Sequence, residues 1–380
     1  MTIGFDATSI LGHSGIEVYA RELIRGISAL QLHDAKLVLM GRRRRGKQLV
    51  EYFGDQVEVR PVIPHDVMLG YRLRPVSRVL QNIAWKANSQ GVDLMHLPGN
   101  ALWRMPSNRY VVTIHDVFPL MPEMDTINAS RREFKSYVEA TSKRAQRIIV
   151  PTQWAADSIV DYLPHTVDKI RVVHHSIREQ FTHRPLNEAR ARELGLRIGA
   201  RYLFFVGRVD PRKNLDRIIS AWTSLDVRSR ADHSMVFVLS GSPKDIEAFR
   251  KRNSNSLQDP SLIVHYGLSD ADVIGLYSSA RGLVFTSTAE GFGLPLLEAM
   301  QCGCPVLTSN TSCLPEVGGD AVLYVDPFSV EEISSGMQRL LNDDVLVSTL
   351  RQRGYDRAKQ FSRASMATKT VAVYNEVLSS

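Results

Sequence analysis

Residues 282–298 read Gly-Leu-Val-Phe-Thr-Ser-Thr-Ala-Glu-Gly-Phe-Gly-Leu-Pro-Leu-Leu-Glu, and this stretch decides the fold. Its first five residues form a short, apolar, β-prone run that predicts a buried strand. Pro295 suits the first turn of a helix, where its missing N–H would be unpaired anyway. Gly303 suits the end of that helix. A buried strand that leads through a loop into a helix indicates an α/β fold.

The loop between this strand and helix has the composition of a ligand-binding turn. Gly291 and Gly293 let the backbone approach a ligand closely, and the N–H groups at the helix start attract oxygens bearing negative charge. Glu290 lies in the loop and Glu298 lies in the helix, so the two carboxylates can contact different parts of one ligand. A negative pair beside an anion-attracting helix end indicates a ligand that carries both phosphates and hydroxyls.

These motifs resemble a known family. Two glutamates separated by seven residues, with Gly-Phe-Gly-Leu-Pro between them and Leu314-Pro-Glu-Val-Gly318 downstream, are similar to the signature of the retaining GT-B glycosyltransferases of family 4. The alternative is a capped core helix in another α/β protein. The resemblance covers the second half of the chain and, less tightly, the first. It implies an α/β, GT-B architecture, with two Rossmann-like parallel-sheet domains facing across a cleft.

The 380 residues are enough for two domains. The pattern becomes polar and loses strand character between about Arg178 and Gly199, which predicts a first domain over 1–180 and a second over 200–358. The resemblance implies that the first domain binds the acceptor and the second binds the nucleotide-sugar donor. It also implies that the last helix, within 361–380, packs back on the first domain.

A turn near the N-terminus is a candidate phosphate contact. It lies between a predicted strand at Thr2–Asp6 and a predicted helix at 16–27, and its backbone N–H groups can reach a phosphate. Family members carry adjacent glycines here, whereas this chain has Ser14-Gly15. We expect Gly15 to contact donor or acceptor.

A histidine follows another predicted strand of the first domain. The strand at 110–114 ends at His115, and a lone histidine at a strand end is more often structural than functional. The resemblance identifies His115 as the residue beside the reacting sugar. Asp116 either orients that ring or caps the next turn. Where many relatives read Asn-Gly, this chain has His175-Ser176, a departure in a connecting turn that says little about chemistry.

The second domain carries a basic turn. It follows a predicted strand at 201–206 and contains Arg208 and Lys213, whose guanidinium and ammonium groups suit a diphosphate. Taken alone, the segment would be a solvated loop. The resemblance implies that Arg208 and Lys213 hold the pyrophosphate, whereas Arg212 has no motif role.

The resemblance assigns the remaining donor contacts to short segments of the second domain. Tyr266 lies where relatives hold the nucleotide base, and Glu298 would hold the ribose hydroxyls. Glu290 would hold sugar hydroxyls and favour the oxocarbenium-like centre. Backbone groups around Phe292, Gly293 and Leu294 would orient the sugar.

The Ser269-Asp-Ala-Asp272 segment has the D-x-D spacing of metal-dependent glycosyltransferases. Its position favours a variant capping box instead, with Ser269 as the N-cap and Asp272 three residues on. We therefore expect no bound metal, and no cofactor apart from the nucleotide sugar, which is a co-substrate.

The net charge of +7 is concentrated in the first half, where residues 1–180 hold 24 Lys and Arg against 18 Asp and Glu. The densest run is Arg42–Lys47. Such a run indicates an anionic partner, either nucleic acid or a membrane surface, or it is a solvated loop. A second basic and apolar segment, with arginines at 72, 74 and 78, either lies on a membrane or packs as an amphipathic helix.

Three cysteines, Cys302, Cys304 and Cys313, give no disulfide framework and suit small apolar filler. No apolar run approaches the roughly 20 residues of a membrane span, and no secretory signal is visible. These features predict a cytoplasmic protein, and the basic first half favours a peripheral position on the inner face of the membrane.

The predicted function is retaining transfer of a hexose to a hydroxyl of a lipid-linked saccharide in the assembly of cell-surface polysaccharide such as lipopolysaccharide. The resemblance to mannosyltransferases favours GDP-mannose over a UDP-sugar as donor. The leaving diphosphate would be stabilised by Arg208, Lys213 and the helix start at Gly293, without a metal.

Two rivals come from other classes. A GT-B sugar-nucleotide epimerase would change the donor sugar without an acceptor. A basic nucleic-acid-binding protein would use Arg42–Lys47, but no aromatic residues are interleaved with that run and no nucleic-acid-binding module is recognisable.

Overall fold

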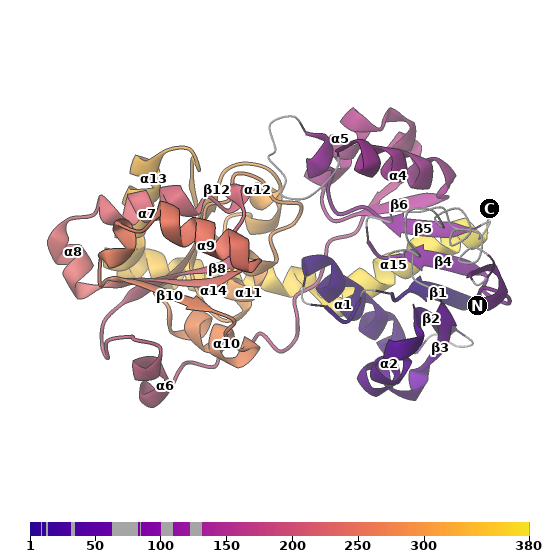
Figure 1. Cartoon of the computed structure of the whole chain (residues 1–380), viewed down its shortest axis with the longest axis horizontal. Helices are drawn as coiled ribbons and strands as arrows, with labels where there is room; N and C mark the ends of the chain where they lie inside the picture. Colours follow the sequence, from indigo (N-terminus) through magenta and orange to yellow (C-terminus); the bar gives the residue numbers. More distant parts are fainter. Residues whose placement is uncertain are drawn as a thin grey trace. The chain divides into compact units, whose positions relative to one another are not determined.

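The computed structural model describes residues 1–8, 10–12, 14–31, 35–62, 83, 85–99, 109–121 and 131–379. The chain forms two compact units, Met1–Ser176 with Ser362–Ser380, and Ile177–Phe361 (Figure 1). Within the described ranges, no helix has the length and apolar character needed to span a bilayer.

The first unit is built on a seven-stranded sheet in which all neighbouring strands are parallel. Its strands follow the order β3-β2-β1-β4-β5-β6-β7. The strands are β1 Thr2–Asp6, β2 Lys36–Arg42, β3 Val57–Val62, β4 Leu94–Leu97, β5 Tyr110–Thr113, β6 Arg147–Val150 and β7 Ile170–Val172. The described α-helices are α1 Gly15–Ala29, α2 Gly46–Phe53, α4 Arg131–Arg144, α5 Gln153–Tyr162 and α15 Arg363–Leu378.

Helix α15 completes the core of the first unit although it comes from the end of the chain. Its Met366, Val371 and Tyr374 are buried in the same cluster as Phe5 of β1 and Leu23 of α1. Helix α1 buries one face because its apolar residues recur at helical spacing. The two helices pack against each other, and Gly26 of α1 sits where an added Cβ would meet the Arg363 side chain at 2.9 Å.

The second unit is built on a six-stranded parallel sheet in the order β10-β9-β8-β11-β12-β13. The strands are β8 Tyr202–Arg208, β9 Ser234–Ser240, β10 Leu262–Tyr266, β11 Gly282–Phe285, β12 Val306–Ser309 and β13 Leu323–Val325. The α-helices are α6 Glu188–Glu193, α7 Leu215–Thr223, α8 Val227–Asp232, α9 Pro243–Arg252, α10 Asp270–Ser279, α11 Leu294–Gln301, α12 Leu314–Gly318, α13 Val330–Asn342 and α14 Asp344–Ala358.

The strand order of the second sheet fixes where its loops meet. From β8 the chain builds outward through β9 to β10, and then returns to place β11 on the other side of β8. At such a reversal a crevice lies outside the carboxyl ends of the two central strands, and ligands bind there. The central strands carry continuous apolar runs, such as Leu203–Phe205, because helices cover both faces of a parallel sheet.

The predicted α/β architecture with two parallel sheets is confirmed, and each predicted strand is present with ends shifted by a few residues. Strand β3 and helix α2 were not predicted. The arginine run is not the loop that we expected: Arg42 ends β2, and Arg43–Arg45 form a 3-10 turn that leads into α2. The second basic segment, with its arginines at 72, 74 and 78, lies outside the described residues.

We predict that Arg363→Ala destabilises the first unit by about 2–3 kcal/mol, because it leaves the buried Glu22 carboxylate with weaker compensation. Arg363 donates from Nε and Nη2 to Glu22 Oε2 at 2.8 and 2.5 Å, and Arg25 Nη1 lies 3.4 Å from the other oxygen. Urea denaturation of the full chain measures the change.

The control is the double variant Glu22→Met with Arg363→Met, which removes both charges and keeps apolar volume. It should be more stable than the single Arg363→Ala variant, since no buried charge remains unpaired. Equal stability of wild type and Arg363→Ala would contradict this account.

Candidate functional site

The loops that leave β8 and β11 meet at the reversal of strand order in the second unit. The backbone N–H of Thr288, in the loop after β11, donates to the carbonyl of Arg212 at 2.8 Å. Asn214, which ends the loop after β8, donates from Nδ2 to the carbonyls of Thr286 and Pro327 at 2.9 and 2.7 Å. These bonds fix the two loops against each other before any ligand binds.

A buried ion pair joins the two loops. Lys213 Nζ lies 2.5 Å from Glu290 Oε1, and the two side chains are 15% and 11% exposed. Lys213 Nζ also lies 4.7 Å from the centre of the Phe285 ring. The structure therefore brings together a cation predicted to hold phosphate and a carboxylate predicted to hold sugar hydroxyls. Arg208 is the last residue of β8, so it lies at the carboxyl-terminal edge of the sheet from which both loops leave. Its side chain is exposed.

The start of α11 has the geometry of an anion-binding helix end. Gly293 is the N-cap with φ of 92°, and a Cβ there would approach Leu314 Cδ2 to 3.0 Å, so a larger residue would be strained. Phe292 is buried just before it, while Leu294 and Pro295 form the first turn as expected. The helix ends at Gln301, before Gly303 with φ of 74°.

Glu298 points its carboxylate at an arginine that the sequence did not reveal. Arg178 donates to Glu298 Oε1 from Nε at 3.0 Å and from Nη2 at 2.8 Å, and to Asp270 Oδ2 from Nη1 at 3.0 Å. Burial raises the pKa of Glu298, and the Arg178 charge opposes that rise. The guanidinium also covers the Phe181 ring at 4.0 Å. Arg178 thus keeps a buried carboxylate oriented and favours its charged form.

Tyr266 ends β10, and its hydroxyl accepts a hydrogen bond from Arg250 Nε at 3.0 Å. The Arg250 guanidinium also lies 4.6 Å from the centre of the Tyr266 ring. The tyrosine side chain is therefore held by α9, which leaves the backbone of the turn after β10 as the part suited to a nucleotide base.

Ser269 is confirmed as the N-cap of α10, whereas the Asp272 carboxylate accepts from the Ser269 hydroxyl at 2.8 Å. Ser269 Oγ accepts from the Asp272 backbone N–H at 3.2 Å, and the Asp272 carboxylate receives Arg190 Nε at 2.8 Å. Within the part of the chain that the structure describes, no three His, Cys, Asp or Glu residues are grouped to hold a metal ion. The D-x-D pair instead contacts two different arginines, since Asp270 pairs with Arg178.

In the first unit, His115 is buried just beyond β5, and hydrogen bonds hold both of its ring nitrogens. Nε2 lies 2.9 Å from the carbonyl oxygen of Pro98, which can only accept, so Nε2 carries the proton. Nδ1 lies 2.9 Å from Nε2 of His175 and accepts from it. Burial lowers the pKa of His115 from 6.5 to about 4, and the ring is neutral at pH 7. Contact with a sugar would replace one of these bonds.

The turn at 175–176, where this chain departs from many relatives, supplies a contact to His115. His175 is buried against His115 and its ring centre lies 4.2 Å from that of Tyr19. Asp116 Oδ1 accepts from the Phe118 N–H at 3.2 Å and caps the next turn. No local sequence signal marks His175, because its partner lies 60 residues earlier.

Gly15 is the first residue of α1, and Ser14 is the N-cap. Ser14 Oγ accepts from the Glu17 N–H, and the Glu17 carboxylate accepts from the Ser14 N–H at 2.7 Å. The serine that replaces a family glycine therefore supplies a capping box. Gly15 is exposed at the helix start, where a ligand oxygen can approach its backbone.

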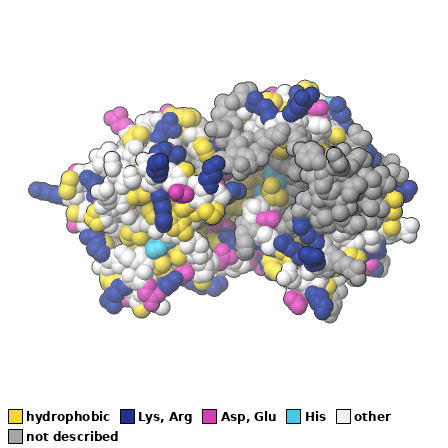
Figure 2. Space-filling view, viewed as in Figure 1, with side chains coloured by type: hydrophobic (Ala, Val, Ile, Leu, Met, Phe, Trp, Pro, Cys, Tyr) yellow, Lys and Arg dark blue, Asp and Glu magenta, His cyan; other side chains and the backbone are white. Residues whose placement is uncertain are grey.

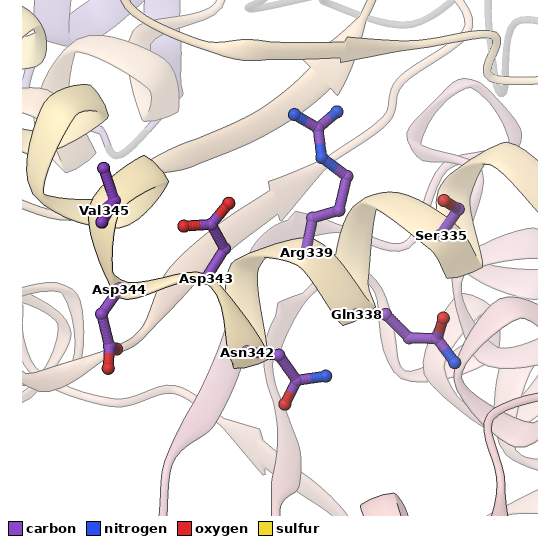
Figure 3. Close-up of a pocket in the computed structure, with 7 residues that line it drawn as sticks. All are labelled: Ser335, Gln338, Arg339, Asn342, Asp343, Asp344 and Val345. Atoms are coloured by element: carbon purple, nitrogen blue, oxygen red, sulfur yellow. The ribbon is translucent and has the colours of Figure 1, made fainter.

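An open surface depression of about 630 Å³ lies elsewhere in the second unit (Figure 3). It is formed at the turn between α13 and α14, with Ser335, Arg339 and Asp343 among its lining residues. It contains none of the predicted site residues, and its side chains splay outward along the helix instead of converging. The ion pair and helix start described above remain the candidate site.

Comparison with known families matches both units. Residues 13–181 match the model described as Glycosyltransferase Family 4, and residues 187–361 match the model described as Glycosyl transferases group 1. Together the two matches cover nearly all of the chain.

The curated relatives include bacterial mannosyltransferases. The serotype-specific mannosyltransferase WbdA of Escherichia coli is 29% identical over 274 residues, which are 71% of this chain and 34% of WbdA. The O-antigen chain mannosyltransferase B of Escherichia coli is 35% identical over 173 residues, 46% of this chain and 45% of that protein. The matched segments thus span a third to a half of these relatives' lengths.

Solved structures share the fold. A sucrose-phosphate synthase from Thermosynechococcus elongatus aligns with a TM-score of 0.78 and 18% identity, over 100% of this chain and 99% of that one. HepE of Anabaena, in complex with UDP-glucose, aligns with a TM-score of 0.77 and 15% identity, over 99% and 100% of the two chains. WaaG, a glycosyltransferase involved in lipopolysaccharide biosynthesis, aligns with a TM-score of 0.73 and 17% identity, over 98% and 99%.

We predict that the first unit loses stability as the pH falls from 6.5 to 5. Burial lowers the folded-state pKa of His115 to about 4, that of His96 to about 3 and that of His175 well below 6.5. Each histidine binds a proton more readily after unfolding, so unfolding takes up protons below pH 6.5 and the stabilisation is lost as pH falls. The expected loss is about 1.5 kcal/mol for each of His115 and His96 between pH 6.5 and 5.

Urea denaturation of the full chain at several pH values, with hydrogen exchange to assign transitions to each unit, measures this. The variant His175→Gln retains an N–H donor near the position of Nε2 but cannot titrate, so its pH dependence should be shallower than that of wild type. An unchanged free energy of unfolding between pH 7.5 and 5 would contradict the prediction.

Proposed function

We propose, because the two halves of this chain belong to the Glycosyltransferase Family 4 and Glycosyl transferases group 1 models, that the protein is a glycosyltransferase. It would transfer a hexose from a nucleotide diphosphate sugar to a hydroxyl of a saccharide acceptor. The observation that carries this proposal is the buried Lys213–Glu290 pair beside the start of α11. A cation, an anion-attracting helix end and a carboxylate are together suited to a ligand with both phosphates and hydroxyls.

Breaking the bond between the sugar C1 and the diphosphate places negative charge on the leaving group. Lys213, Arg208 and the backbone N–H groups at the start of α11 are proposed to absorb that charge. Lys213 would bind a phosphate oxygen through its ammonium group, which in the structure contacts Glu290. In this scheme the protein side chains and backbone do the work of a metal ion, and no cofactor is required.

The two glutamates are proposed to hold the two sugars of the donor. Glu290 would accept hydrogen bonds from hydroxyls of the transferred hexose and favour positive charge near C1. Glu298, kept oriented by Arg178, would accept from the ribose hydroxyls. His115 is proposed, on the family resemblance, to contact the transferred sugar, and Gly15 to contact donor or acceptor through its backbone. Retention of anomeric configuration is likewise an inference from the family.

The donor is proposed to be GDP-mannose and the acceptor a lipid-linked saccharide of a cell-surface polysaccharide. The relatives WbdA and O-antigen chain mannosyltransferase B, both named as mannosyltransferases, support this choice. A UDP-sugar is the alternative donor, since HepE of Anabaena was solved with UDP-glucose. Use of such an acceptor places the proposed reaction in the cytoplasm, at the inner face of the membrane.

Helix α2 and the turn before it are the proposed membrane contact. Arg44, Arg45 and Lys47 are exposed there, and Val50 and Tyr52 of α2 are 40% and 38% exposed. On the face shown in Figure 2, acidic side chains lie among the Lys and Arg side chains. Cations and partly exposed apolar side chains on one short segment suit an anionic bilayer surface.

We predict that Lys213→Ala lowers the transfer rate by about 10²–10³-fold, the usual cost of removing a group that stabilises developing charge. The same variant should lose the rise in melting temperature that GDP, UDP, ADP or dTDP sugars give the wild type. A thermal-shift panel with these four nucleotides and their sugars measures binding and identifies the donor. Release of nucleotide with and without acceptor then measures turnover.

Lys251→Ala, at an exposed position of α9, is the matched control and should behave as wild type. Excess EDTA should leave transfer intact. Strong inhibition by EDTA would refute the metal-free scheme, and a sugar altered without acceptor would indicate an epimerase.

We predict that the protein floats with vesicles that contain phosphatidylglycerol and much less with phosphatidylcholine alone, and that salt of about 0.5 M weakens the binding. Arg44→Glu with Arg45→Glu should reduce partitioning by at least about 30-fold, at roughly 1 kcal/mol for each lost cation. Lys244→Glu with Lys251→Glu on α9 is the control with the same charge change. Equal loss in both double variants, or flotation that salt does not affect, would count against a specific contact through α2.

A further inference from the structure

A strained turn after β12 contacts the loop that carries Glu290. The turn spans residues 310–313 and leads into α12. Ser312 has φ of 55° although it is not glycine. A non-glycine residue in this region costs energy and persists where the surrounding contacts hold it there. Those contacts are made to Glu290.

Two neighbouring residues of the turn bond the two backbone polar groups of Glu290. The Glu290 N–H donates to Ser312 Oγ at 3.2 Å, and Cys313 Sγ donates to the Glu290 carbonyl at 3.0 Å. A third contact, from Thr311 Oγ1 to the carbonyl of Thr288 at 3.3 Å, ties the same two loops together. Cys313 is fully buried, and burial raises the pKa of its thiol, so it remains an S–H donor.

These bonds restrict Glu290, the residue whose carboxylate is proposed to hold hydroxyls of the transferred hexose. With the N–H and carbonyl of Glu290 both held, the direction of its Cα–Cβ bond is fixed from the side of β12. Lys213 holds the carboxylate from the other side at 2.5 Å. The Glu290 side chain is thus held at its Cα end by the backbone hydrogen bonds and at its carboxylate end by the ion pair with Lys213.

We propose that Ser312 and Cys313 are positioning residues that fix the backbone of Glu290, so that its carboxylate is aimed at the donor sugar. The proposal rests on the proposed function, because it assigns to Glu290 a contact with the sugar. Small errors of placement at a reacting centre cost large factors in rate. The backbone strain at Ser312 is the cost of presenting the hydroxyl and the thiol to the same residue.

The discriminating variant is Ser312→Gly, which removes the hydroxyl and also relieves the backbone strain, since glycine adopts positive φ freely. We expect its melting temperature to equal or exceed that of wild type while kcat falls about 10-fold and the Kd for the nucleotide diphosphate is unchanged. A merely structural role would make activity follow stability. Gln31→Gly, at an exposed position with φ of 44° in the first unit, is the control and should leave kcat unchanged.

The second half of the pair is tested at Cys313. Cys313→Ala removes the donor to the Glu290 carbonyl and should lower kcat several-fold. Cys313→Ser restores an O–H donor and should recover most of the lost rate. If alanine and serine are equally impaired, hydrogen bonding by Cys313 is not what positions Glu290.

Hydrogen exchange separates failure of this proposal from failure of the proposed function. Ser312→Gly should raise the exchange rate of the Glu290 amide about 10-fold or more, whatever reaction the protein catalyses. If wild type transfers sugar from none of the nucleotide sugars, the proposed function fails, and the exchange result alone decides whether the backbone is held. Unchanged exchange, or faster exchange with unchanged kcat in an active enzyme, would overturn the positioning role.

Discussion

The ion pair between Lys213 and Glu290 joins two loops whose strands are neighbours in the sheet but lie 74 residues apart in the chain, from the end of β8 to the start of β11. Its existence depends on the strand order, which places β11 against β8 and leaves the loops after them at the same edge. The start of α11 at Gly293 follows closely on Glu290 in the chain. The contacts from Ser312 and Cys313 hold the backbone of the same glutamate. The chemistry of the second unit is therefore a consequence of its topology.

Both units bury carboxylates in ion pairs, Glu22 with Arg363 in the first unit, and the first unit also buries a network of neutral groups. In the second unit two buried carboxylates are paired with basic side chains, Glu290 with Lys213 and Glu298 with Arg178. In the first unit a chain of neutral groups is buried: His96 bonds Tyr374 and Thr113, and Thr113 bonds Tyr19. Paired charges suit a unit proposed to bind a charged nucleotide, whereas a neutral network avoids the cost of burying charge and orients its rings through hydrogen bonds.

The sequence predicts those parts of the fold and site that are contiguous in the chain. The strand, loop and helix around Glu290 are read from one stretch because β-prone residues, glycines and Pro295 follow each other there. Strand β3 was missed because it is an edge strand in which charged residues and Pro61 interrupt the apolar pattern. Arg178 and Ser312 could not be assigned to Glu298 and Glu290, since they lie 120 and 22 residues away and meet them only once the parallel sheet has formed. The roles of the site residues toward a ligand stay predictions.

Helix α15 gives the chain an unusual order of assembly. Residues 362–380 complete the unit that begins at Met1, so the whole second unit is an insertion within the first. The ends of the insertion are adjacent, because the Ile177 N–H donates to the Phe361 carbonyl at 3.2 Å. During synthesis on the ribosome the second unit therefore emerges complete while the first still lacks the helix that covers α1. The first unit can bury its complete core only after Arg363–Leu378 has been synthesised.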